Sequence, residues 1–177
     1  MEAQASEVAM PAESAVTFNA KSPEGCSWLS WLKSERRDYV VFCGFSRAER
    51  VAMIKQGLPA VFLVKVAADM RVPREEVFKW LGISKASANR KVRARTVLSL
   101  SESERTLGFA RLIGKVSRIV RESGESQGFD PAKWTASWLG RPNPALGGGR
   151  PGEYLDTADG RALIASLVGQ MQSGAYA

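Results

Sequence analysis

The sequence predicts a mostly α-helical protein, and three kinds of signal support this. Apolar residues recur every three or four positions along residues 107–120, which is the spacing of one helix face. Serines that can cap helices and glycines that can end them alternate along residues 46–84. Prolines open several of the apolar stretches, and proline is tolerated in the first helical turn.

The N-terminal part of the chain is expected to hold a tail and two helices. Residues 1–22 contain few large apolar groups, so we expect a flexible tail there. Residues 27–37 can form a short helix, and the apolar run 39–42 fits either a strand or a buried loop. Ser46 can cap the next helix, which we expect to end at Gly57.

The two helices that follow have clear boundaries. Leu58 and Pro59 open the first of them; the second begins after Pro73 and is ended by Gly82. The first helix is expected to bury Val61, Phe62, Val64, Val66 and Ala67.

A linker, a long helix and two shorter helices are expected in the rest of the chain. Residues 96–100 form the linker, and Ser101 with Glu104 matches the S-x-x-E capping box that precedes a long amphipathic helix. Pro131 opens a helix that ends near residue 139, and the final helix is expected over residues 157–171.

Positive charge is concentrated in the middle of the chain. The whole sequence carries a formal net charge of +7. Residues 47–121 hold 17 lysines and arginines against 6 acidic residues, a net charge of +11, while the remainder is mildly acidic. A localised basic surface favours an anionic partner, either nucleic acid or an acidic protein face.

Residues 74–95 match the pattern of a helix-turn-helix motif. Gly82 supplies the turn between two short helices, and Ser84 can cap the second of them. Phe78 is bulky where this motif usually has a small residue, and Ala88 is small where leucine is common, so we expect the two to exchange volume across one contact. The core-facing set is expected to include Val77, Leu81, Ile83, Ala88 and Val92.

The outward face of the second helix in this motif is basic. Long cationic and amide side chains suit phosphates and base edges. An ordinary helical hairpin with a solvated basic face is the alternative interpretation. The predicted DNA contacts are Lys85, Ser87, Asn89, Arg90 and Arg93.

Composition argues against an enzyme. The chain contains no histidine, which removes Ser-His and Cys-His nucleophile systems and His-ligated metals. Cys26 and Cys43 are too few and too far apart for a zinc cage. We expect no catalytic residue, no metal and no cofactor. The N-terminus lacks the pattern of a signal peptide and no apolar run is long enough to span a bilayer, so we expect a cytoplasmic protein without membrane contact.

A loop rich in proline and glycine separates the last two predicted helices. Pro142 and Pro144 fix φ and lack an N–H, which makes the loop stiff. The glycines at 147–149 allow close backbone approach. Stiff loops present a surface at low ordering cost, so the loop suits a protein interface, although a plain connector is the alternative.

Several segments resemble the Xre/MbcA/ParS antitoxin family in order and spacing. The resemblance covers residues 47–177 and is strongest at the Pro-Asn-Pro-Ala-Leu-Gly-Gly stretch. The matching segments are residues 57–59, 81–84, 101–105, 138–139, 142–148 and 155–157, Gly160 and residues 174–177.

The resemblance implies an antitoxin with two domains after the tail. Residues 23–100 would form an Xre-like helix-turn-helix domain with an N-terminal extension, which binds operator DNA and represses the operon; the resemblance does not explain residues 1–46. Residues 101–177 would form a small helical toxin-binding domain that occludes the active site of a RES-domain toxin, which consumes NAD or transfers its ADP-ribosyl group. The implied assembly is a homodimer within a hetero-oligomeric complex. The implied toxin contacts are Pro142, Asn143, Pro144, Leu146, Gly147, Gly148 and Tyr176, the last of which would enter the toxin's NAD pocket.

A function from another class stays open at this point. The chain could be a stand-alone transcription regulator whose C-terminal half dimerises or senses a small molecule. A toxin gene beside this one would favour the antitoxin.

Overall fold

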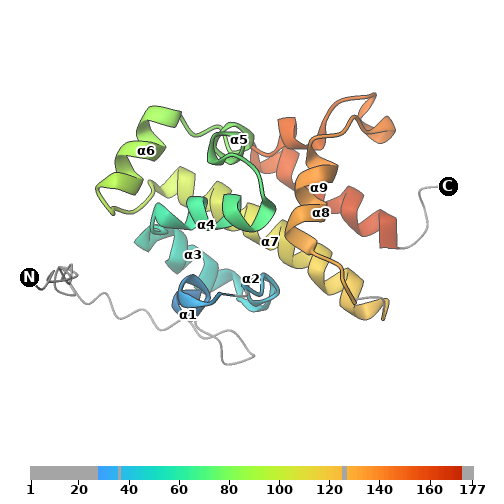
Figure 1. Ribbon diagram of the computed structural model, residues 1–177, viewed down its shortest axis with the longest axis horizontal. Coiled ribbons are helices and arrows are strands. Elements are labelled where there is room, and N and C mark those ends of the chain that lie inside the picture. Colours follow the sequence, from blue (N-terminus) through green and yellow to red (C-terminus); the bar gives the residue numbers. More distant parts are fainter. Residues whose placement is uncertain (1–27, 36, 125–126, 173–177) are drawn as a thin grey trace, which may run out of the picture.

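The computed structural model describes residues 28–35, 37–124 and 127–172. Within these ranges the chain forms nine α-helices and two short 3₁₀ helices, and the only β geometry is an isolated bridge between Pro59 and Val97. The mostly α-helical fold class is therefore confirmed (Figure 1). No helix in the described ranges is both long and apolar enough to cross a membrane. The tail expected at residues 1–22 lies outside the described residues.

An aromatic cluster joins three of the first four helices. Trp31 stacks on Phe62 with ring centroids 4.5 Å apart and meets the edges of Tyr39 and Phe42. The expectation of a strand or loop at residues 39–42 was wrong, because Tyr39 begins a turn that leads into a short helix and buries Phe42 completely. The helices are α1 (Trp28–Lys33), α2 (Val41–Gly44), α3 (Arg47–Gln56) and α4 (Val61–Met70).

Local signals set the boundaries of α3, whereas packing sets the buried face of α4. Ser46 caps α3 in a capping box with Glu49, and Gly57 ends it with φ of 86°, as expected. In α4, Val61 was predicted to be buried but is 41% exposed. The buried face of α4 is therefore rotated relative to the predicted one. The buried residues of α4 are Phe62, Leu63, Val66, Ala67 and Met70.

The long helix α7 (Leu100–Glu122) begins at a different cap from the predicted one. Ser99 and Glu102 form the capping box: the Ser99 N–H donates to the Glu102 carboxylate at 2.7 Å, and the Glu102 N–H donates to the Ser99 hydroxyl at 3.3 Å. The box predicted at Ser101 and Glu104 was therefore wrong. Because the cap lies two residues earlier than predicted, Glu102 is buried beside Lys91 and forms an ion pair with it. Ser101 and Glu104 are exposed.

Helix α7 crosses the molecule and joins its two halves (Figure 1). It packs against α2 and α3 on the N-terminal side and against the last two helices on the C-terminal side. One continuous core runs through both halves, from Trp31 to Val168. The C-terminal elements are α8 (Pro131–Leu139), η1 (Pro144–Leu146), η2 (Pro151–Tyr154) and α9 (Ala158–Gln172).

Candidate functional site

Two short helices joined by a glycine turn form the predicted helix-turn-helix. They are α5 (Arg74–Trp80) and α6 (Lys85–Arg93). Gly82 adopts φ of 59°, and the Ile83 N–H donates to the Phe78 carbonyl at 2.8 Å, which closes the turn. A left-handed residue with such a hydrogen bond is a common way to end a helix. The core side is formed by Val77, Phe78, Leu81, Ile83 and Ala88, all buried, with Val92 packed against them.

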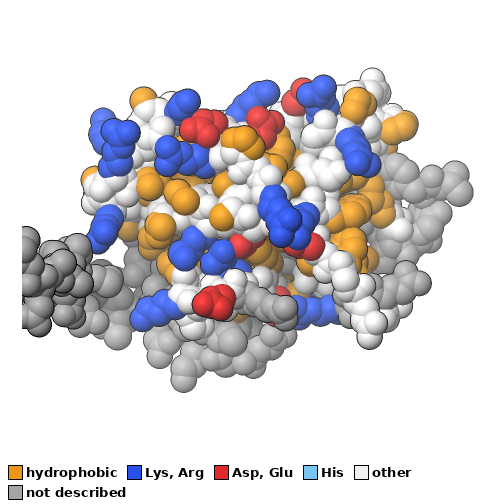
Figure 2. All heavy atoms as spheres, viewed as in Figure 1, with side chains coloured by type: hydrophobic (Ala, Val, Ile, Leu, Met, Phe, Trp, Pro, Cys, Tyr) orange, Lys and Arg blue, Asp and Glu red, His pale blue; other side chains and the backbone are white. Residues whose placement is uncertain are grey.

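The outward side of α6 presents cations. Its N-terminus is capped by the Ser84 hydroxyl, which accepts from the Ser87 N–H at 3.2 Å. Lys85, Arg90 and Arg93 are exposed. The Nζ of Lys85 lies 3.8 Å from a carboxylate oxygen of Glu75 on α5. Figure 2 shows lysine and arginine side chains gathered over this end of the molecule, at the upper left. Lys85 lies in the first turn of α6 and Arg90 and Arg93 in its last turn, so exposed cations along this helix suit DNA phosphates.

Other polar residues of α6 face inward. Ser87 and Asn89 are half-buried. The Asn89 Oδ1 is buried and has no hydrogen-bond partner within the described part of the chain, so this oxygen is not offered to a base edge in this conformation. Lys91 pairs with Glu102 at the start of α7. Burial would raise the Glu102 pKa, but the bonds from Lys91 and Ser99 outweigh it and hold that pKa below its ordinary value.

The loop between α8 and α9 is organised around Asn143, which is buried. The Asn143 N–H donates to the Gly149 carbonyl at 3.0 Å, and its Oδ1 accepts from the Ala145 N–H at 2.9 Å. Gly147 and Gly148 complete the turn with φ of 61° and 87°. Asn143, predicted as a toxin contact, is 5% exposed and supports the loop from within. The predicted contacts that remain exposed are Pro142, Pro144, Gly147 and Gly148.

Of the other two predicted toxin contacts, only Leu146 lies within the described residues. Leu146 is half-buried and packs against the core. Tyr176 lies outside the described residues.

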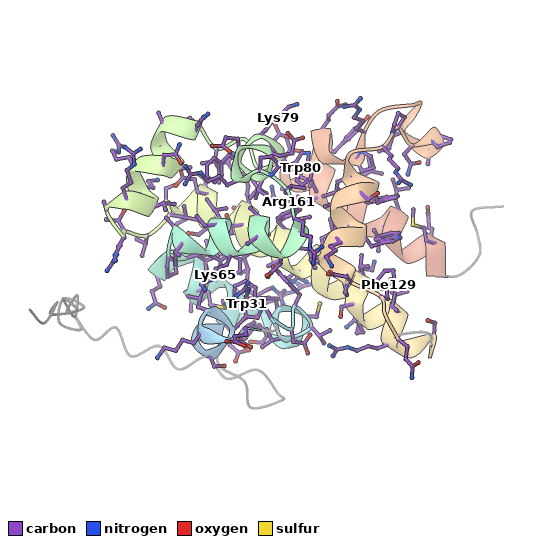
Figure 3. All side chains as sticks on the ribbon, viewed as in Figure 1. Trp31, Lys65, Lys79, Trp80, Phe129 and Arg161 are labelled. Carbon is purple, nitrogen blue, oxygen red and sulfur yellow. The ribbon has the colours of Figure 1, made fainter. Side chains whose placement is uncertain are left out.

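The η2 helix that follows the loop is seated directly on the helix-turn-helix, which sequence reasoning missed. A Cβ added at Gly152 would lie 2.5 Å from Nε1 of Trp80, so the backbone of η2 lies close against this indole. Trp80 also meets the ring of Phe109 in α7, with centroids 6.1 Å apart. Figure 3 labels Trp80 where α5 meets the C-terminal half. The presence of Trp80 on the first helix of the motif could have indicated a contact with another part of the chain. Nothing in the neighbouring sequence indicated that Gly152 would be that contact.

Both halves of the chain match known antitoxin domains. Residues 49–111 match the antitoxin Xre-like helix-turn-helix domain, and residues 128–174 match the antitoxin Xre/MbcA/ParS C-terminal toxin-binding domain.

Two relatives are similar over most of their length. The chain is 41% identical over 132 residues to the Prs ADP-ribosylating antitoxin of Sphingobium sp. (strain YBL2), which covers 75% of this chain and 83% of that protein. It is 23% identical over 123 residues to antitoxin Xre of Photorhabdus laumondii subsp. laumondii, covering 70% and 78%. The chain therefore belongs to the Xre/MbcA/ParS family, and is an antitoxin of a toxin–antitoxin system.

Proposed function

We propose that this antitoxin neutralises a RES-domain toxin that consumes NAD or transfers its ADP-ribosyl group, and that it represses its own operon by binding operator DNA. The name of the Sphingobium relative refers to ADP-ribosylation, which supports this toxin class. The exposed loop around Pro142–Gly148 is the observation that carries the proposal. It is held from within by Asn143, so it can meet a toxin surface with little loss of conformational entropy.

The proposed role of the helix-turn-helix follows from its outward face. Lys85, Arg90 and Arg93 lie on the side of α6 away from the core, where they can reach phosphates when the helix lies in a major groove. A homodimer would present two such helices to two half-sites of the operator.

Replacing Ala145 with arginine tests the toxin interface. Ala145 is exposed on η1, and its N–H keeps its bond to Asn143 after substitution. We expect A145R to weaken binding of the RES-domain toxin from the neighbouring reading frame at least about tenfold, equal to ~1.4 kcal/mol, because a bulky charge must be desolvated in the interface. Affinity and NAD consumption by the complex are the measurements.

The matched control is Ala48→Arg, which places the same side chain at an exposed position of α3 in the other half of the chain. It should leave toxin affinity and inhibition unchanged. Equal affinities for both variants would show that the loop does not contact the toxin.

Removing single cations from α6 tests DNA binding. We expect Arg90→Gln or Arg93→Gln to weaken binding to the operon's own promoter. Each should also flatten the log–log dependence of affinity on salt by about one unit, because each lost phosphate contact releases one counterion fewer. Fluorescence anisotropy across a salt series measures both effects. Lys65→Gln on α4 is the control of equal charge, and a slope change as large in this variant would rule out α6 as the DNA-facing helix.

A further inference from the structure

A cavity of about 530 Å³ lies between α3, α7 and α9. Three of its cations come from α7 at positions i, i+4 and i+7, which share one helix face. The others come from α3 and from α9, where Arg161 is labelled in Figure 3. The cationic lining residues are Arg50, Arg111, Lys115, Arg118 and Arg161, and Glu104 is the acidic one.

Little of this positive charge is neutralised. The guanidinium of Arg161 lies 3.5 Å from the Glu104 carboxylate, and that of Arg118 lies 3.9 Å from the carboxylate of Glu122, one helical turn away. In the described ranges of the chain, no carboxylate forms an ion pair with Arg111 or Lys115, and Lys115 instead donates to a backbone carbonyl of α9. The Nε of Arg111 is buried without a hydrogen-bond partner in these ranges. An unpaired donor of this kind costs stability unless a ligand completes it.

The electrostatics of the cavity favour an anion. Burial lowers the pKa of Arg111, and the positive charges of Arg50 and Arg118 lower it further. Burial also lowers the pKa of Lys115, with Arg118 adding to the effect. Cations that are both desolvated and crowded repel one another, so a multiply charged anion placed among them gains more than it would at a solvated surface.

The shape of the site favours a small molecule over a macromolecule. Its volume lies within the range of small-molecule pockets. No residue of α6 lines it, so it is separate from the face proposed for DNA. Arginine forks bind phosphate oxygens in pairs, and arginines from three helices line this cavity.

We propose that this cavity binds a small phosphorylated anion, of the class of inorganic pyrophosphate or a nucleotide phosphate group, through Arg50, Arg111 and Arg161. Such a ligand would tie α9, in the toxin-binding half, to α3 and α7. It would therefore stabilise the packing between the two halves of the chain.

Isothermal titration of the full-length chain with inorganic pyrophosphate, at constant ionic strength, tests the proposal. We expect saturable binding, and a loss of at least about tenfold in affinity for Arg111→Met, because an interior charge-assisted bond is removed. Arg121→Gln is the matched control: it removes one charge from the same helix, but Arg121 pairs with Asp38 at 3.0 Å and does not line the cavity.

If Arg111→Met does not fold, Arg118→Gln replaces it, since that side chain is 51% exposed and tolerates substitution. A smaller loss, about threefold, is then expected for this less enclosed charge. Two results would overturn the proposal. One is the absence of saturable heat up to about 10 mM pyrophosphate, where even weak phosphate sites fill. The other is an equal change in the cavity variant and in Arg121→Gln.

Discussion

Replacing Phe78 with alanine is expected to lower the free energy of unfolding by about 3–5 kcal/mol, the range for truncating a buried aromatic side chain. Phe78 is 1% exposed and lies on α5, and Ala88 on the packed helix α6 is fully buried. Because the alanine side chain is short, Ala88 itself cannot fill the space that the lost ring would leave. Denaturant-induced unfolding monitored by circular dichroism measures the loss.

Two further variants separate packing from other effects. Phe129→Ala makes the same change at a half-buried position and should cost clearly less. The double variant Phe78→Ala with Ala88→Leu returns volume to the contact and should recover part of the lost stability, because volume-conserving exchanges are tolerated best. If the added leucine lowered stability further, the idea of a volume exchange between these positions would fail.

Gly114→Ala is expected to destabilise the fold by separating α7 from the turn that precedes α2. A Cβ at Gly114 would overlap the backbone carbonyl oxygen of Tyr39 and lie 3.0 Å from Sγ of Cys43. A backbone atom cannot rotate away as a side chain can, so the two segments must move apart. Overpacking of this kind costs about 1–3 kcal/mol.

The same helix supplies the control for this glycine. Gly108→Ala brings the same gain in helix propensity, about 1 kcal/mol, but its Cβ would meet only the Arg161 side chain at 3.1 Å. We expect Gly114→Ala to be less stable than Gly108→Ala by about 1–3 kcal/mol in chemical denaturation. Equal stabilities would mean that the contact with Tyr39 is loose.

Helices with strong local signals were predicted well. The expected helix from Pro131 to Leu139 is confirmed at both ends, because Asp130 caps it and Pro131 occupies its first turn. The short helix α2 was missed because its formation depends on burying Phe42 against Trp31 and Phe62, which local sequence does not reveal.

Tertiary contacts decided what the sequence left ambiguous. Two overlapping S-x-x-E matches precede α7, and the ion pair with Lys91 selects the one that contains Glu102. In the loop, nothing in the sequence distinguishes Asn143 from its exposed neighbours. The bond from its backbone N–H to the Gly149 carbonyl turns Asn143 inward. The cations of the cavity are spaced on one face of α7, yet their meeting with Arg50 and Arg161 depends on how three helices pack.

The seating of Gly152 on Trp80 has a consequence for how such antitoxins can be recombined. The first helix of the helix-turn-helix and η2, which follows the loop proposed to meet the toxin, share a contact that admits no side chain at Gly152. A chimaera that joins the N-terminal half of one antitoxin to the C-terminal half of another must therefore match at this contact, as well as along α7. Exchange of partner specificity is then limited by compatibility between the halves, and new pairings are expected to arise more readily by substitution on exposed faces than by domain shuffling.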